Sequence, residues 1–452
     1  MKRIQTATEA GAWLEGLINF ERDPALSNDR LNLEPIRGLL DRVDRPERGL
    51  SIIHIAGSKG KGSTSLFAES ILRAGGERVG TFTSPHLERW TERFRINGEE
   101  VEGGELAKAV ETLRPHVEAM RQDLPSRAPT FFDVTTAAAL LLFSRLGMDR
   151  VILEVGLGGR LDSTNVVQPA STCVTQIELE HTDRLGNTLA AIAGEKAGIL
   201  KPGVPVVMGR LKPSAAKVVV ARAEEVGAPL RRFGKDFKVE SLEIGTEAAV
   251  DCPKEALQGF RYHDGAGLKA SMGLSVLGAH QIDNAVLAME VVANLPGWSR
   301  LAVIEAARSG LMEARLPGRL EILETKPFVL VDSAHTEESA RALRRVLDQV
   351  RVGQERFVLS MSRDKDVEAV LAQLISGSSE IWLTRADAHR SLDPQSLSLI
   401  CERVAPGCRV TCEENPRAAL AAARNTLGQE GLLCCTGSVY LAGLARGILG
   451  RG

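Results

Sequence analysis

The segment 52–65, IIHIAGSKGKGSTS, restricts the fold of this chain more than any other part of its sequence. An apolar run predicts a strand at 52–56, the glycines after it predict a turn, and a helical pattern follows. Glycines let the backbone approach phosphate oxygens, and a helix N-terminus adds positive potential for an anion. Lys61 can bridge the terminal phosphates of a nucleotide, so this segment predicts a phosphate loop rather than a glycine-rich surface turn. The predicted phosphate-binding residues are Gly57, Gly60, Lys61, Gly62 and Ser63.

Short apolar runs alternate with longer amphipathic segments along the chain, which predicts an α/β fold with a parallel sheet covered by helices. The expected strands are 50–56, 79–83, 151–154, 173–177 and 204–208, and the expected helices are 61–74, 105–120, 132–146 and 188–200. Short β segments at 237–244 and 268–276 precede helices at 280–294 and 301–311, and a second βα series runs from 328 to 436. We therefore expect a large N-terminal, mostly parallel sheet domain at 1–314, which contains the phosphate loop, and a smaller α/β domain at 315–452.

Composition excludes several classes of protein. The net charge of −2 and an aromatic content of 4% argue against nucleic-acid binding. No stretch approaches the roughly 20 apolar residues of a membrane span, and the first residues lack a signal-peptide core, so we expect a cytoplasmic protein. The seven cysteines are odd in number and form no CxxC pair, so we expect buried thiols rather than disulfides or a zinc site.

An acidic residue ends the expected strand at 151–154. Glu154 precedes a glycine loop, and a carboxylate at the carboxyl end of a strand in a doubly wound sheet suits a Mg²⁺ ligand. A salt bridge at the strand end is the alternative, and the nearby phosphate loop favours Mg²⁺. His54 lies within the first strand and is expected to be a core residue.

The phosphate loop reads G-x-x-G-K-G-S instead of the usual G-x-x-x-x-G-K-[ST]. This shortened form resembles the loop of Mur-type ligases, and G-K-G-S resembles the folylpolyglutamate synthase/dihydrofolate synthase family in particular. The resemblance covers nearly the whole chain. It implies a Mur-ligase-type ATP-binding domain at 1–314 and a Rossmann-like glutamate ligase domain at 315–452. It also implies a monomeric ligase that uses ATP to add L-glutamate to dihydropteroate, to a folate or to both, through an acyl phosphate.

Three motifs match residues that bind or surround Mg²⁺ in this family. Ser84 in T-S-P-H-L is expected on one Mg²⁺ with Glu154, and His181 in E-L-E-H-T is expected on a second. Glu180 stands where the family usually has Asp. Lys196 in E-K-A-G-I matches a lysine that is carbamylated in relatives, and a plain ion-pairing lysine is the alternative. The resemblance makes Lys61, His181 and Lys196 the catalytic set.

The motif R-L-D-S-T-N at 160–165 matches the acceptor site of the family. Asp162 and Ser163 are expected to bind the acceptor. Asp162 is expected to contact the pterin, and Ser163 stands in place of the usual Ala. An Asp turn that caps Thr164 is the alternative. The family commonly has Glu where this chain has Asp133, which is expected either to orient the substrate or to begin the following helix.

The remaining matches imply further contacts with ATP. Asn284 in G-A-H-Q-I-D-N-A is expected to face the adenine and the phosphates. Arg319 in L-P-G-R-L, together with Asp332 and His335 in D-S-A-H-T, is expected to reach ATP from the second domain. Ser333 stands where the family often has Gly.

Two other functions remain open at this point. One is a Mur-type ligase that acts on a peptidoglycan precursor, which shares the chemistry and differs in the acceptor. The other is a P-loop nucleotide-binding module without ligase activity. Asp162 and the G-K-G-S loop favour a folate acceptor over a peptidoglycan precursor. The ATP contacts expected in the C-terminal domain argue against a nucleotide-binding module without ligase activity.

Overall fold

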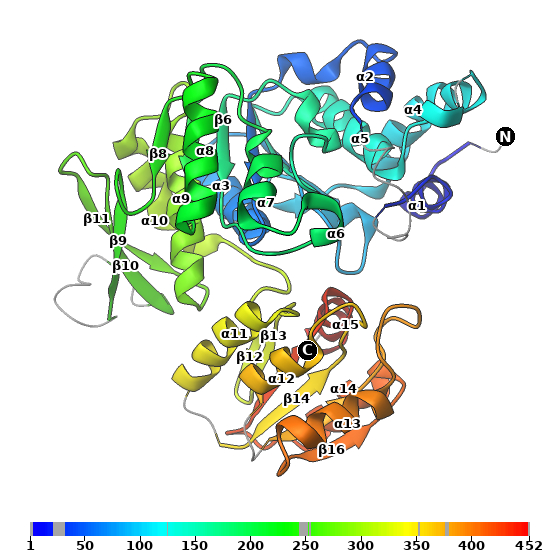
Figure 1. Cartoon of the computed structure of the whole chain (residues 1–452), viewed down its shortest axis with the longest axis vertical. Coiled ribbons are helices and arrows are strands. Elements are labelled where there is room, and N and C mark those ends of the chain that lie inside the picture. Colours follow the sequence, from blue (N-terminus) through cyan, green and yellow to red (C-terminus); the bar gives the residue numbers. More distant parts are fainter. Residues whose placement is uncertain are drawn as a thin grey trace. The chain divides into compact units, whose positions relative to one another are not determined.

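The computed structural model describes residues 3–20, 32–123, 125–243, 252, 255–350, 353–375 and 379–450 (Figure 1). The chain forms two compact units. The N-terminal unit comprises Met1–Ser275 and Gln281–Ala314, and the C-terminal unit comprises Val276–His280 and Arg315–Gly452. Within the described ranges, no helix is long and apolar enough to cross a membrane.

An eight-stranded sheet in the order β4-β3-β2-β5-β1-β6-β7-β8 forms the centre of the N-terminal unit. The strands from β2 to β8 in this order run parallel, and β3 and β4 are antiparallel additions at one edge. The strand bounds are β1 Ile52–Ala56, β2 Val79–Phe82, β3 Phe94–Ile96, β4 Glu99–Glu100, β5 Arg150–Glu154, β6 Ser171–Val174, β7 Val206–Met208 and β8 Leu230–Arg232. This sheet confirms the expected α/β class with a mostly parallel N-terminal sheet.

Two apolar cores lie between helices of this unit and the sheet. Phe82 and Leu153 lie in one apolar core with residues of α1, α2, α4 and α5, and Val174 and Val206 lie in another with α7 and α8. The helices are α1 Ala7–Glu15, α2 Glu34–Asp41, α3 Lys61–Ala74, α4 Gly103–Asp123, α5 Phe131–Arg145, α6 Thr182–Leu185, α7 Leu189–Ala197, α8 Pro213–Glu225, α9 Ala279–Ala293 and α10 Arg300–Glu313, with 3-10 turns at Pro46–Gly49, Trp90–Arg93, Pro125–Arg127 and Ser163–Val166. Since α3 follows β1 directly and packs along β1, β2 and β5, the sheet positions its N-terminus.

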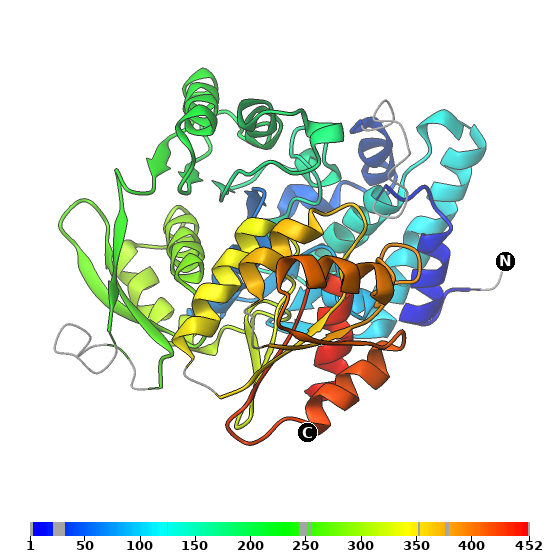
Figure 2. The same cartoon turned by 60° about the horizontal axis from the view of Figure 1, so that its bottom comes forward.

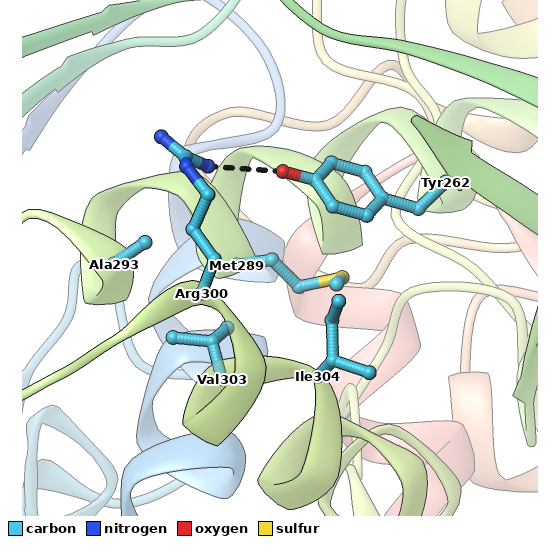
Figure 3. Close-up of a pocket in the computed structure, with 6 residues that line it drawn as sticks. All are labelled: Tyr262, Met289, Ala293, Arg300, Val303 and Ile304. Carbon is cyan, nitrogen blue, oxygen red and sulfur yellow. Dashed lines mark hydrogen bonds between the residues drawn. The ribbon is translucent and has the colours of Figure 1, made fainter. Parts of the chain in front are cut away.

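A small antiparallel sheet stands at one edge of the same unit, beside α9 and α10 (Figure 1). Its strands are β9 Lys238–Leu242, β10 Gln258–His263 and β11 Lys269–Leu274. A fully buried carboxylate, Glu290 of α9, joins this sheet to its surroundings. It accepts from Tyr262 Oη at 2.6 Å, from Arg231 Nε of β8 at 2.7 Å and from Arg300 Nη1 of α10 at 3.1 Å. Arg300 also donates to the hydroxyl of Tyr262 at 3.0 Å, as Figure 3 shows, so four elements meet at one acid.

The C-terminal unit is a doubly wound sheet in the order β12-β13-β17-β14-β15-β16, with only β12 antiparallel to its neighbour. Adjacent strand residues point to opposite faces. Cys434 therefore lies in the core under α11, α12 and α13, and Cys435 lies in the core under α14 and α15. Helices cover both faces of this sheet (Figure 2). The elements are β12 Glu321–Thr325, β13 Phe328–Val331, β14 Glu355–Leu359, β15 Glu380–Leu383, β16 Arg409–Cys412, β17 Leu432–Thr436, α11 Glu337–Gln349, α12 Val367–Leu374, α13 Pro394–Val404, α14 Pro416–Asn425 and α15 Val439–Leu449.

All seven cysteines are free thiols. The expectation that they are buried is confirmed for Cys173, Cys252, Cys401, Cys434 and Cys435. It is wrong for Cys412, which is exposed because edge strand β16 leaves part of its surface to solvent, and Cys408 is half-buried.

Candidate functional site

The predicted phosphate loop lies between β1 and α3, at the carboxyl edge of the sheet. β1 is buried at every position, and α3 begins at Lys61. The segment after β6 fixes the loop. Ser58 N donates to Gln176 O at 2.6 Å, and Thr175 Oγ1 donates to Lys59 O at 2.6 Å. The strand, turn and helix expected at 52–65 are confirmed.

Two glycines let this loop pass close to its neighbours. Gly57 has φ +153°, and a Cβ there would lie 1.9 Å from Thr175 Oγ1. Gly60 has φ +83°, and a Cβ there would lie 2.3 Å from Asn284 Oδ1. Asn284, near the start of α9, is thereby placed against the phosphate loop, where it donates from Nδ2 to Gln281 Oε1 at 3.0 Å.

Gly57→Ala should raise the ATP concentration needed for half-maximal binding at least about tenfold, since the new methyl group forces the loop away from Thr175. ATP titration by calorimetry measures the effect. Gly76→Ala is the matched control, because Gly76 also has a positive φ of +86° and a Cβ there meets nothing within 4 Å. Equal ATP affinity in the Gly57 and Gly76 variants would contradict this account of the loop.

Two lysines and one acid surround the same loop carbonyl. Lys61 Nζ and Lys196 Nζ each donate to Gly57 O at 2.9 Å, and Lys196 Nζ also contacts Glu180 Oε1 at 2.8 Å. Burial lowers the pKa of Lys196 to about 8, against the opposing charge of Glu180. Burial acts to raise the pKa of Glu180, but the ammonium groups of Lys196 and Lys61 outweigh it and lower that pKa to about 2. The arrangement presents positive charge at the loop where a phosphate would lie.

The other predicted metal ligands follow neighbouring strands. Ser84 comes after β2, Glu154 ends β5 and His181 comes after β6, and these strands flank β1 in the order β2-β5-β1-β6. Since the strands are parallel, their carboxyl ends share one edge of the sheet. Glu154 is 3% exposed and accepts from Ser84 N at 3.1 Å, and the exposed His181 adopts a left-handed φ of +46°. A buried carboxylate and a serine therefore lie together beside the phosphate loop.

Asp162 shapes its own loop. Its Oδ2 accepts from the N–H groups of Gly156 at 3.1 Å and Leu157 at 2.8 Å. Its Oδ1 accepts from Thr164 N at 3.0 Å and Thr164 Oγ1 at 2.5 Å. The alternative that Asp162 caps Thr164 is confirmed, whereas its contact with an acceptor stays a prediction. The hydroxyl of Ser163 donates a hydrogen bond to Asp133 Oδ1 at 2.7 Å.

Three predicted ATP contacts lie together in the C-terminal unit. Asp332 directly follows β13 and accepts from Leu320 N and Ala334 N, both at 2.8 Å. His335 Nδ1 lies 2.8 Å from Ser333 O, and Arg319 Nη1 donates to Pro317 O at 3.3 Å. Ser333, which replaces the usual Gly, sits in this turn without preventing the carboxylate of Asp332 from closing it.

Sequence reasoning missed two residues of the site. Glu180 was noted only as a replacement for Asp, yet it is the ion-pair partner of Lys196. Thr175 secures the loop carbonyls of both Ala56 and Lys59, at 3.3 and 2.6 Å. Thr175 lies within the strand expected at 173–177, and nothing in the sequence indicates that its side chain contacts the phosphate loop.

Known protein families match both units. The family described as Mur ligase middle domain matches residues 55–292, and the family described as Mur ligase, glutamate ligase domain matches residues 318–439.

Curated relatives match along most of the chain. A dihydrofolate synthase/folylpolyglutamate synthase of Bacillus subtilis is 33% identical over 440 residues, which cover 96% of each chain. The protein of the same name from Escherichia coli is 33% identical over 396 residues, which cover 87% of this chain and 86% of the relative.

Solved structures share the fold. Folylpolyglutamate synthase of Mycobacterium tuberculosis complexed with ADP has a TM-score of 0.86 and 30% identity, covering 99% of this chain and 98% of that one. Escherichia coli FolC in complex with DHPP and ADP has a TM-score of 0.82 and 28% identity, covering 99% of each chain.

Proposed function

This chain belongs to the folylpolyglutamate synthase/dihydrofolate synthase family of the Mur ligase superfamily, and from this premise we propose how its residues perform the reaction. The protein is an ATP-dependent amide-forming ligase that adds L-glutamate to dihydropteroate or to a folate. The observation that supports the residue assignment is the phosphate loop, with the ammonium groups of Lys61 and Lys196 both 2.9 Å from Gly57 O.

The reaction has two displacement steps. The carboxylate of the acceptor attacks the γ-phosphorus of ATP, and the bond from that phosphorus to the bridging oxygen breaks. ADP is released, and the acceptor becomes an acyl phosphate. The amine of glutamate then attacks the acyl carbon, phosphate leaves, and the nitrogen loses one proton as the amide forms. Lys61 and the N–H groups at the start of α3 stabilise the charge that moves between the phosphate oxygens.

Mg²⁺ fits the residues beside this loop. Mg²⁺ prefers oxygen ligands and commonly takes one or two from the protein and the rest from phosphates and water. The buried carboxylate of Glu154 and the adjacent Ser84 supply such a set. His181 offers a nitrogen ligand, and we assign it to a second ion on the family resemblance alone. Glu154 and Ser84 would hold Mg²⁺, which when bound would neutralise negative charge on the phosphates of ATP.

Glu154→Gln should raise the Mg²⁺ concentration for half-maximal turnover at least about tenfold, because the amide removes the charge that attracts the ion. A Mg²⁺ titration of ADP release measures the effect. Glu105→Gln, on α4 and paired with Lys108, is the matched control. An unchanged Mg²⁺ midpoint in the Glu154 variant would count against this ligand.

We also assign a carbamate to Lys196. Its side chain is 2% exposed, and burial lowers the pKa of its amine to about 8, so the neutral form that attacks CO₂ becomes more abundant as the pH rises through 8. The attack forms an N–C bond and releases one proton, which gives a carboxylate near the metal ligands. Glu180, as the partner of the unmodified ammonium, would have to release it.

Lys196→Arg should lower turnover about a hundredfold, because arginine keeps a positive partner for Glu180 but forms no carbamate. Carbon NMR of the wild-type protein in isotope-labelled bicarbonate should show a carbamate signal that the variant lacks. Lys201→Arg is the control, since burial also lowers the pKa of Lys201, which donates to Asn165 O. The same signal in the Lys196 variant would assign the carbamate elsewhere.

For the acceptor, we propose that Asp162 contacts the pterin. For ATP, we propose contacts with Asn284, Arg319, Asp332 and His335. Steady-state turnover with dihydropteroate, with a reduced folate and with a UDP-linked peptidoglycan precursor, each with glutamate and ATP, tests this assignment. We expect turnover with the first or second and none with the third. The domain boundary at 314/315, the monomeric state and the cytoplasmic location stay predictions.

A further inference from the structure

Two buried groups of hydrogen bonds, joined by the backbone of residues 162–164, link the start of α5 to the middle of β1. Their members are 0–7% exposed, which is unusual for so many polar side chains in one place. They are His54, Asp133, Asp162, Ser163 and Thr164.

At the helix end, Asp133 is fully engaged. Its Oδ2 accepts from Thr130 N and Thr130 Oγ1, both at 2.8 Å, which closes a capping box at the first turn of α5. Its Oδ1 accepts from Ser163 Oγ at 2.7 Å. Burial raises the pKa of Asp133, and the hydrogen bonds from Ser163 and Thr130 oppose that rise. The carboxylate therefore joins two segments that are 30 residues apart in sequence.

At the strand end, Thr164 connects His54 to Asp162. Thr164 Oγ1 lies 2.5 Å from Asp162 Oδ1 and 2.8 Å from His54 Nε2. Because the hydroxyl proton goes to the carboxylate, His54 must donate from Nε2, and its Nδ1 then has no partner among the described residues. Burial lowers the pKa of His54 to about 3, which keeps the ring neutral.

We propose that Asp133 and Ser163 are positioning residues for the acceptor, because their hydrogen bond holds the Asp162 loop against the first turn of α5. The proposal rests on the proposed function, in which Asp162 contacts the pterin. Phe132 precedes Asp133 and packs its ring against the same loop, where a Cβ on Gly156 would lie 2.6 Å from Phe132 Cζ. A shift of Asp133 would therefore move the ring of Phe132 that packs on the loop, as well as the hydrogen bond from Ser163.

The two members of the pair are both departures from the pattern that the chain otherwise resembles. The resemblance has Glu at 133 and Ala at 163, whereas this chain has a shorter acid and a larger neighbour that contact each other. The hydroxyl of Ser163 lies 2.7 Å from Asp133 Oδ1, so the longer side chain of Glu at 133 would have to displace it or adopt another rotamer. The two differences should thus compensate, and a double substitution should recover what each single substitution loses.

The test compares Ser163→Ala, Asp133→Glu and the double variant in the full-length protein, with KM measured separately for dihydropteroate and for ATP. Loss of a hydrogen bond to a buried carboxylate should raise the KM for dihydropteroate about tenfold in each single variant, with kcat and the KM for ATP within about twofold of wild type. The double variant should return to within about threefold of wild type. Ser70→Ala is the matched control, since Ser70 is a buried serine whose hydroxyl donates to Gly310 O at 2.7 Å, and it should leave both KM values unchanged.

Different outcomes overturn different claims. Wild-type protein without turnover on dihydropteroate or folate overturns the proposed function and this inference with it. Normal wild-type turnover with an unchanged KM for dihydropteroate in Ser163→Ala overturns the positioning role alone. Single effects that simply multiply in the double variant, or that raise the KM for ATP equally, also overturn it.

Discussion

Replacing Lys61 with alanine should lower glutamate-dependent release of ADP about a thousandfold, because a cation on the transferred phosphoryl group stabilises the transition state more than the bound ATP. The side chain lies on the loop already, with Nζ 2.9 Å from Gly57 O. Lys61, the first residue of α3, therefore already has its ammonium group on the loop where we propose that the phosphates bind. Steady-state kinetics with saturating acceptor and glutamate measure the loss.

Binding and turnover should separate in this variant. ATP affinity, measured by calorimetry, should fall far less than turnover, because the backbone N–H groups of the loop remain. Lys108→Ala is the matched control, since Lys108 is an exposed lysine that pairs with Glu105 on α4, and it should behave as wild type. Near-normal ADP release by Lys61→Ala would mean that the phosphates bind elsewhere, and the assignment of the loop would be wrong.

Glu290→Ala should reduce the free energy of unfolding of the N-terminal unit by about 3–5 kcal/mol, because it leaves two guanidinium groups without their buried carboxylate. Glu290 is fully buried, and Arg231 and Arg300 contact it at 2.7 and 3.1 Å. The hydroxyl of Tyr262, which donates to Glu290 Oε1 at 2.6 Å, would lose its acceptor as well. Urea denaturation followed by circular dichroism measures the change.

Two variants calibrate this prediction. Tyr262→Phe removes one hydrogen bond and should cost about 1 kcal/mol. Glu305→Ala, at an exposed position of α10, should stay within about 0.5 kcal/mol of wild type. A loss below about 1 kcal/mol for Glu290→Ala would mean that the arginines find water or other partners, and that the cluster does not anchor the small sheet.

The buried parallel strands and their helices could be predicted because periodicity and burial agree there. The expected helix 61–74 begins and ends where α3 does, and the βα series expected from 328 to 436 begins with β13 and ends with β17. These elements consist of residues whose spacing reflects a buried environment. The expected strand 173–177 begins and ends later than β6, because the residues after Val174, among them Thr175, bond to the phosphate loop instead of continuing the strand.

Edge strands escaped prediction for the opposite reason. β12 reads EILET and β16 reads RVTC, and neither strand is fully buried at any position. An edge strand is paired on one side only and carries charged residues, so its sequence lacks the apolar run of a central strand. β10 was missed within a stretch that was expected to hold short β segments, because glycine and charged residues interrupt it.

Motifs located the candidate site, but not the contacts inside it. The glycines and Lys61 could be assigned from the loop, since backbone conformation and charge are encoded locally. The pairing of Lys196 with Glu180 spans 16 residues, and that of Ser163 with Asp133 spans 30. Such contacts depend on how the strands order themselves, which no local pattern records. The sequence likewise left open whether Asp162 caps its own loop, and the structure shows that it does.

Helix α9 carries two fixed points. Asn284 lies against Gly60, and Glu290, six positions later, holds the arginine cluster. Each residue added to or removed from the turns between them would rotate one point about 100° around the axis relative to the other. The spacing of residues 284 and 290 therefore fixes the angle between these two side chains around the helix axis. A change in the length of this stretch would lose either the contact of Asn284 with the phosphate loop or the ion pairs of Glu290 with Arg231 and Arg300.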